Sequence, residues 1–168
     1  LGGATALLPI YAHDILHTGP WGLGVLRGAP AAGALVMTVV LARHAIKRRV
    51  GMRMFQAVIV FGCAIVVFAV SRRIWLSLIA LAIMGAADTV SVVIRVSLVQ
   101  LTTPDALRGR VGALNYLFVN ASNQLGEFES GMTAALLGAM PAALLGGIGT
   151  IVIALAWMKL FPALRNVE

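Results

Sequence analysis

The sequence predicts an all-α integral membrane protein, and three observations support this fold class. Of the 168 residues, 60% are apolar and only 11% are charged, and the mean hydropathy is +0.96, values outside the usual range of soluble domains. The apolar residues form runs long enough to cross a membrane. Most Lys and Arg residues, which give the net charge of +7, lie in short segments between these runs. This is typical of cytoplasmic loops beside anionic lipid and does not indicate nucleic-acid binding.

The first segment, about residues 1–12, predicts only part of a spanning helix. Its apolar run ends after about half of the roughly 20 residues that a membrane crossing needs. The sequence begins with Leu1 and has no basic leading region, which argues against a signal peptide. We therefore expect a truncated first helix in a chain that is the C-terminal part of a longer protein.

Residues 13–20 are polar and rich in turn formers, which predicts a loop. His13 and His17 are four residues apart, a spacing that could hold a metal ion on a helix, but the Gly-Pro turn that follows favours a solvated loop. The one cysteine, Cys63, leaves no disulfide framework or thiolate metal site. We expect no metal site and no bound cofactor.

Five longer apolar runs predict full membrane-spanning helices. At about 1.5 Å per residue, four of them are long enough for a hydrocarbon core of about 30 Å, and residues 54–71 cross it together with their flanks. The connections are short, so consecutive helices are expected to be antiparallel neighbours. The expected helices cover about residues 21–43, 54–71, 74–99, 111–138 and 140–161.

Basic residues lie mainly on one side of the predicted membrane. Nine of them flank the first and third loops between the full helices or lie in the C-terminal tail, whereas Arg72 and Arg73 lie on the other side. This asymmetry predicts a cytoplasmic location for the richer side and for the C-terminus. The nine residues are Arg43, Lys47, Arg48, Arg49, Arg53, Arg108, Arg110, Lys159 and Arg165.

The predicted helices differ in polarity. Segments 54–71 and 142–158 carry no charged residue and are expected to face lipid. The other three carry ionisable residues, which should face protein or water. Gly24, Gly28 and Ala32 repeat every four positions, which predicts a close helix contact. The ionisable residues within these spans are Arg27, Asp88, Arg95, Glu127 and Glu129.

Asp88 is the first candidate for a functional residue. It lies near the middle of its predicted helix, where an ionised Asp costs about 2.5 to 3.5 kcal/mol, so it needs a partner, a proton or a cavity. Arg95 lies on the same helix face but about 10.5 Å farther along the axis, so a direct ion pair is not expected. Asp88 is either a carrier of protons or cations, or a structural hydrogen-bond anchor between helices.

The helix at 111–138 carries a second candidate group. At about 100° per residue, six of its residues fall within an arc of about 80°, which predicts a wet or hydrogen-bonded face. Asn115, Ser122 and Glu129 form another stripe on nearly the opposite side, so we expect a central helix with protein on both sides. A functional role is favoured for Glu127, and a structural role for Glu129. The six residues are Tyr116, Asn120, Asn123, Gln124, Glu127 and Gly131.

The number and order of the predicted spans resemble the C-terminal six-helix half of a twelve-helix transporter of the major facilitator superfamily. In that superfamily the third and sixth helices of each half are peripheral, in agreement with the two charge-free segments. The loop Arg-Arg-Val-Gly-Met-Arg at 48–53 is similar to a degenerate copy of the cytoplasmic motif Asp-Arg-x-Gly-Arg-Arg. The motif's Asp is absent here, which leaves lipid anchoring or packing at helix ends. Its candidate gating or loop residues are Arg48, Arg49, Gly51 and Arg53.

The stretch Thr-Pro-Asp-Ala-Leu-Arg-Gly-Arg-Val at 103–111, with Ser-Asn-Gln-Leu-Gly-Glu at 122–127, is similar to one branch of bacterial exporters. That branch includes the enterobactin exporter and macrolide efflux pumps. The resemblance implies proton-driven efflux of a small amphipathic molecule, of the drug or siderophore type, by alternating access across the bacterial inner membrane. It also implies three partners: the lipid bilayer, the substrate and the missing N-terminal half of the same protein.

The loop before the helix at 111–138 predicts a short cytoplasmic helix. Thr103 can cap it, Pro104 suits its first turn, and Asp105 favours its positive end. Arg108 and Arg110 then lie at the membrane surface, as anchors on the basic side or as gating contacts.

Three alternatives to an active transporter remain open. An intramembrane serine protease would need a Ser and a His within the membrane, but Glu129-Ser130-Gly131 is a weak match and every His lies near a loop. An ion channel would need a filter loop or a charged ring, and the sequence shows neither. The third alternative is a remnant that is inactive alone. We favour a transporter rather than an enzyme, with Asp88 and Glu127 as contacts for protons or substrate.

Overall fold

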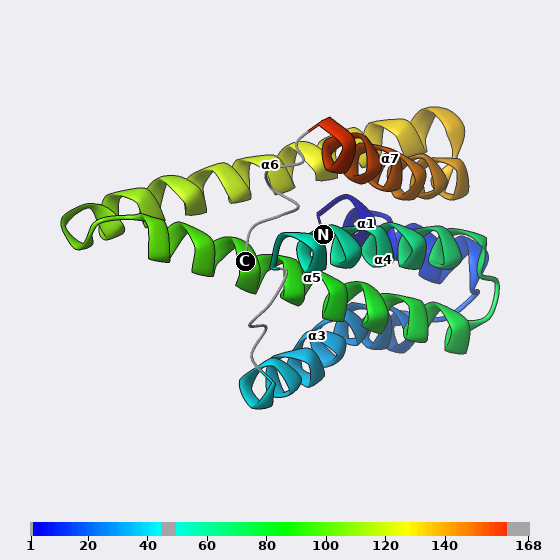
Figure 1. Ribbon diagram of the computed structural model, residues 1–168. Coiled ribbons are helices and arrows are strands. Elements are labelled where there is room, and N and C mark those ends of the chain that lie inside the picture. The colour runs from blue at the N-terminus through cyan, green and yellow to red at the C-terminus, as the bar shows by residue number, and fades with distance from the viewer. Residues whose placement is uncertain (1, 45–49, 161–168) are drawn as a thin grey trace.

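The computed structural model (Figure 1) describes residues 2–44 and 50–160, and all regular structure in these ranges is helical. The predicted all-α class is therefore confirmed. Within these ranges, four helices are long and apolar enough to cross a membrane: α3 (Pro20–Arg43), α4 (Val50–Val70), α5 (Ile74–Thr102) and α7 (Ala139–Leu160). A fifth helix, α6 (Arg108–Leu137), is 30 residues long and more polar.

The first segment is broken into three short pieces: α1 (Gly2–Ala6), α2 (Leu8–Ile10) and the π-helical turn η1 (Tyr11–Ile15). The expected loop at 13–20 is therefore wrong in its first three residues, because η1 continues to Ile15. The loop is closed by Thr18, whose backbone N–H and hydroxyl both donate to the carbonyl of Ala12.

The long helices extend beyond the expected bounds at several ends. α4 begins four residues before position 54, α5 continues three residues past position 99, and α6 begins three residues before position 111. The added turns carry polar or basic residues, such as Arg53 and Gln100, beyond the apolar runs. Apolar composition marks the part of a helix that crosses lipid. The hydrogen-bonded helix itself can continue past that part into water, so its ends lie beyond the apolar run.

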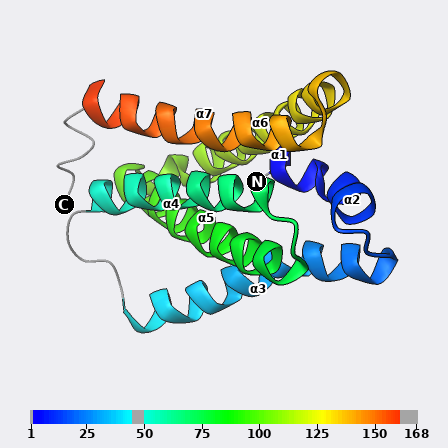
Figure 2. The same ribbon diagram turned by 90° about the vertical axis from the view of Figure 1, so that its right-hand side faces the viewer.

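α4 is the middle helix of the described bundle, because it packs against α5 on one side and α7 on the other (Figures 1 and 2). The expectation that segment 54–71 is peripheral is therefore wrong for most of its surface, and only one stripe is left exposed. Val60, Cys63 and Val67 are exposed on that stripe, whereas Phe55, Ile65 and others are buried. An all-apolar helix suits lipid and protein neighbours equally, so its composition does not distinguish them.

The expectation that the helix at 111–138 is central, with protein on both sides, is wrong within the described chain. α6 packs against α1 and α7 and only weakly against α5, and Ala134 is its one buried residue. Figure 1 shows α6 and the last turns of α5 extending together beyond the other helices.

Close helix contacts use glycines other than the predicted ones. A Cβ built on Gly33 of α3 would lie 1.8 Å from the carbonyl oxygen of Ala82 in α5. Gly24 and Gly28, which were expected to form a close helix contact, have no atom of a neighbouring helix within 4 Å of such a Cβ. α4 and α7 meet in the same way, since a Cβ on Gly62 would lie 3.0 Å from the Gly147 oxygen.

The two ends of the bundle differ in character. The end where α3 and α7 finish and α5 turns into α6 carries five of the described basic residues. At the opposite end, Trp21 and Trp75 are 78% and 76% exposed on the first turns of α3 and α5. Exposed Trp near helix ends is typical of the interface between lipid and water. The five basic residues are Arg43, Arg53, Arg108, Arg110 and Lys159.

Candidate functional site

Asp88 occupies the midpoint of α5, with 14 residues on each side between Ile74 and Thr102. Its side chain is half-buried. Among the described residues, no hydrogen bond or ion pair to Asp88 is present, and its carboxylate instead faces two cavities. A carboxylate in this position can accept a proton or contact a polar ligand group without first breaking a protein contact.

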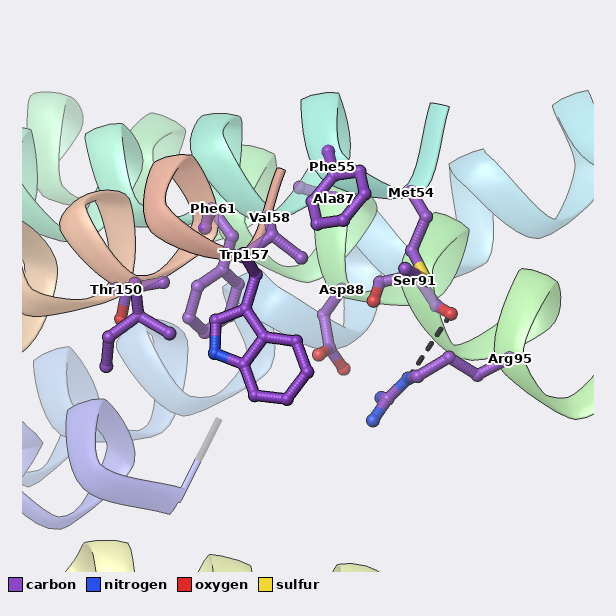
Figure 3. Close-up of a pocket in the computed structure, with 12 residues that line it drawn as sticks. Met54, Phe55, Val58, Phe61, Ala87, Asp88, Ser91, Arg95, Thr150 and Trp157 are labelled. Carbon is purple, nitrogen blue, oxygen red and sulfur yellow. Dashed lines mark hydrogen bonds between the residues drawn. The ribbon is translucent and has the colours of Figure 1, made fainter. Parts of the chain in front are cut away.

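The larger cavity lies between α4, α5 and α7 and has a volume of about 510 Å³. Asp88 of α5 and Trp157 of α7 both line this cavity, and Figure 3 shows the carboxylate and the indole next to each other in that view. The α4 and α7 walls are largely apolar, whereas α5 contributes most of the polar groups. The lining residues are Met54, Phe55, Val58, Phe61, Ala87, Asp88, Ser91, Arg95, Thr150, Ile153, Ala154 and Trp157.

The smaller cavity, of about 390 Å³, lies between α5 and α6. Asp88 and Arg95 line it from α5, and two polar residues of α6, Ser122 and Asn123, line it from the other side. This cavity therefore brings four polar side chains of two helices to one space. Its remaining walls are apolar, formed by Val92, Phe118 and Val119.

Arg95 faces both cavities but does not pair with Asp88. Its Nε donates to the backbone oxygen of Ser91, one turn earlier, at 3.4 Å (Figure 3), and the side chain is otherwise exposed. The absence of a direct ion pair agrees with the expected axial separation. The Asp88 carboxylate and the Arg95 guanidinium are thus two separate charged groups on the α5 wall of both cavities.

The polar face predicted on α6 is divided in the structure. Asn123 lines the smaller cavity, but Gln124 and Glu127 are exposed on α6 and line neither cavity. Asn120 is half-buried and donates to the backbone oxygen of Tyr116 at 2.8 Å. Asn123 therefore lines the same cavity as Asp88 and Arg95. Asn120, Gln124 and Glu127 do not line it.

The turn between α5 and α6 is organised by Arg108. Its Nε donates to the backbone oxygens of Gln100 and Thr103 at 3.2 and 3.3 Å, and its Nη1 lies 2.6 Å from the Asp105 carboxylate. Arg108 therefore binds carbonyl groups at the C-terminal end of α5, a role that neither alternative from the sequence included. Arg110 is exposed.

The short helix expected in this turn is present as η2 (Asp105–Leu107), a single 3-10 turn. The expected cap is wrong, because the Thr103 hydroxyl donates backward to the carbonyl of Val99. Pro104, expected in the first turn, precedes it as the N-cap.

The other candidate loop residues divide into two groups. Gly51 is buried and Arg53 is exposed, both in the first turn of α4, whereas Arg48 and Arg49 lie outside the described residues.

Two residues of the cavities were missed by sequence reasoning. Ser122 was assigned to a structural stripe, and Trp157 lies in the last turns of a segment expected to face lipid. An aromatic residue near the end of a span is usual at the membrane interface, so no sequence signal separates Trp157 from that role. Its place beside Asp88 depends on how α7 packs on α4.

Comparisons with known proteins agree with this architecture. A family model described as transmembrane secretion effector matches residues 2–168. The enterobactin exporter EntS of Citrobacter koseri is 27% identical over 144 residues, which are 86% of this chain and 35% of the relative. The chain thus spans about a third of the length of this curated relative. No solved structure matches the chain.

Proposed function

Because the chain belongs to the transmembrane secretion effector family, a group of major facilitator superfamily exporters, we propose that it forms part of a longer protein that exports a small amphipathic molecule by coupling to protons. Export is the activity named for the enterobactin exporter EntS. The chain contributes one wall of the transport pathway in this proposal, and the remaining protein contributes the opposite wall.

The observation that carries the proposal is the position of Asp88. It lies at the centre of a membrane-spanning helix, half-buried, next to two cavities and without a protein partner among the described residues. Holding an ionisable group at this depth costs free energy, which favours a role in binding or proton transfer. Asp88 is the proposed proton carrier, and Arg95 with Asn123 are the proposed substrate contacts in the smaller cavity.

Amphipathic cargo is supported by the lining of that cavity. Carboxylate, guanidinium, hydroxyl and amide groups face it together with a phenyl ring and two valine side chains. A site of this kind can orient a polar head with a few directed groups while it buries an apolar body.

The exposed polar face of α6 is assigned to the interface with the remaining protein. Gln124 and Glu127 are exposed in this chain, and charged groups in a membrane rarely contact lipid directly. Glu127 is therefore the second proposed contact for protons or substrate, through a pathway that both halves would enclose.

Orientation follows from the charge distribution. The basic end of the bundle is assigned to the cytoplasm of a bacterial cell and the Trp21 and Trp75 end to the outer side of the inner membrane. Arg72 and Arg73, at the second end, are the exception to this distribution.

The test is transport by the full-length protein in liposomes. Amphipathic dyes, macrolides and catecholate siderophores would be loaded in turn, and their movement measured with and without an imposed pH gradient. Gradient-dependent movement of at least one class is expected. Movement of none, or movement that ignores the pH gradient, would contradict the proposal. The 168 residues alone are expected to give no net transport, because they form one wall only.

A further inference from the structure

The space between α5 and α6 continues from the smaller cavity toward the basic end of the bundle. A further cavity, of about 120 Å³, lies there, and we call it the end cavity. On α5 it begins at Val96, next to Arg95 of the smaller cavity, and on α6 it reaches Asn115, one turn from Val119 of the smaller cavity. The two cavities therefore follow one another along the same two helices. The end cavity is lined by Val96, Val99, Gln100, Thr103, Arg108, Gly112 and Asn115.

One face of each helix lines the two cavities, which together form the α5–α6 crevice. Residues at intervals of three or four positions line it from Asp88 to Thr103 on α5 and from Arg108 to Ser122 on α6, which is the period of a single helix face. At about 1.5 Å per residue, the α5 face is about 22 Å long. The crevice thus runs from the middle of α5 to the turn where α5 and α6 extend beyond the other helices (Figure 1).

Two polar residues of α6 that were assigned to a structural stripe face this crevice. Asn115 lines the end cavity and Ser122 lines the smaller cavity, whereas Glu129 of the same stripe lines neither. Asn115 is half-buried, and neither Asn115 nor Ser122 has a side-chain hydrogen bond within the described chain. Polar groups without a partner are costly inside a membrane unless water reaches them. Their positions therefore favour a crevice that holds water.

The two cavities differ in what they can hold. Pockets for drug-sized ligands measure about 300 to 1,000 Å³, and the smaller cavity, of about 390 Å³, falls in this range. The end cavity, of about 120 Å³, does not. A water molecule occupies about 30 Å³ in the liquid, so the end cavity has room for several water molecules. Its size therefore admits water and excludes an amphipathic substrate.

We propose that the α5–α6 crevice is a water-filled proton route between Asp88 and the basic end of the bundle, separate from the path of the substrate. The inference rests on the proposed role of Asp88 as the proton carrier. A proton that leaves the Asp88 carboxyl group passes to a water molecule of the crevice, leaves a carboxylate behind and moves along the water to the bulk solvent. The charged side chains along the route are Asp88, Arg95 and Arg108, and Arg108 is paired with Asp105.

The first measurement asks whether the crevice is wet, and it uses two positions of α5 in the full-length protein. Val96 and Val93 are 37% and 41% exposed, but only Val96 lines the end cavity. Counted from Asp88, half of a hydrocarbon core of about 30 Å corresponds to about ten residues, so both positions lie within it. Val96→Cys and Val93→Cys would each be made in a cysteine-free background that includes Cys63→Ser.

A small anionic thiosulfonate and a bulky fluorescein maleimide would be added from the side of the basic end. The thiosulfonate is expected to modify Val96→Cys at least severalfold faster than Val93→Cys, and the maleimide should modify neither at a comparable rate. Equal thiosulfonate rates at the two positions would show that the crevice is not a distinct water route. Rapid modification of Val96→Cys by the maleimide would show an opening wide enough for substrate. Either result overturns the inference.

The second measurement blocks the end cavity with Gly112→Leu. Gly109→Leu is the matched control, since it makes the same change three residues earlier on α6 but outside the end cavity. A Cβ at either glycine has no neighbouring atom within 4 Å, so both variants can fold without moving a backbone.

Both variants would be assayed in liposomes for substrate accumulation driven by a pH gradient and for substrate exchange without a gradient. Gly112→Leu should accumulate substrate severalfold more slowly and exchange it at the wild-type rate, while Gly109→Leu should match wild type in both assays. Wild-type accumulation by Gly112→Leu, or an equal loss of accumulation and exchange, overturns the inference. The cysteine measurement does not use transport. A dry crevice in a coupled transporter therefore refutes the route alone, whereas wild type without proton coupling refutes the proposed function.

Discussion

A Cβ built on Gly85 of α5 would lie 2.0 Å from the carbonyl oxygen of Pro30 in α3. Both residues are buried, and Gly33 meets Ala82 in the same way one turn along. The backbones of α3 and α5 are therefore in direct contact, and this contact holds the helix that carries Asp88.

Gly85→Ala is expected to destabilise the protein by about 1 to 3 kcal/mol, because the added methyl group must push two backbones apart. Gly28→Ala is the control, since a Cβ there has open space, and it should be neutral or slightly stabilising in a helix. Thermal unfolding in detergent measures both. Equal stability of the two variants would show that α3 and α5 are not this close.

Tyr11 is expected to contribute about 1 kcal/mol through its hydroxyl. This hydroxyl donates to the backbone oxygen of Ala69, in the last turn of α4, at 3.1 Å, and the ring packs on Phe68 with centroids 4.5 Å apart. Tyr11→Phe keeps the ring contact and leaves the buried oxygen without this donor. Tyr116→Phe, at a 71% exposed position, should leave the unfolding temperature unchanged. A similar loss for both variants would contradict the assigned bond.

Arg108 is expected to hold the C-terminal turn of α5. Arg108→Ala should raise amide hydrogen exchange in residues 99–107, and Arg108→Lys should restore little, because a single ammonium cannot reproduce the guanidinium fork. The free-energy change should be below about 1 kcal/mol, since the side chain is half-exposed. Arg110→Ala serves as the matched control and should leave exchange unchanged. Unchanged hydrogen exchange in Arg108→Ala as well as in Arg110→Ala would show that Arg108 does not hold this turn.

The number and order of the long helices could be predicted from the sequence, because a run of apolar residues longer than the hydrocarbon core has few alternatives to a spanning helix. The position of Asp88 near the middle of its helix followed from the same reasoning. What could not be predicted was which helix face meets which neighbour. In lipid an apolar side chain is equally suited to protein and to acyl chains, so α4 could be read as peripheral although it packs between α5 and α7.

The same uncertainty about which helix faces meet explains why the candidate site was predicted only in part. Ser122 and Asn123 are adjacent in sequence and about 100° apart on a helix, and the expected stripes placed them on different faces. In the structure both line the cavity that Asp88 faces, because that cavity meets α6 along a broad arc. Likewise, Gly33 rather than Gly28 contacts α5. The two glycines are five positions apart, about 140° around a helix, so the face that α3 turns to α5 decides which glycine is used.

The most direct test of the central claim measures coupling at Asp88. Full-length wild type, Asp88→Asn and Glu129→Gln would be reconstituted in liposomes. Each would be assayed for substrate accumulation driven by a pH gradient and for substrate exchange without a gradient. The account predicts that Asp88→Asn loses accumulation but retains exchange, while Glu129→Gln, an exposed position outside both cavities, retains both. Accumulation by Asp88→Asn at the wild-type level would contradict the assignment of Asp88 as the proton carrier.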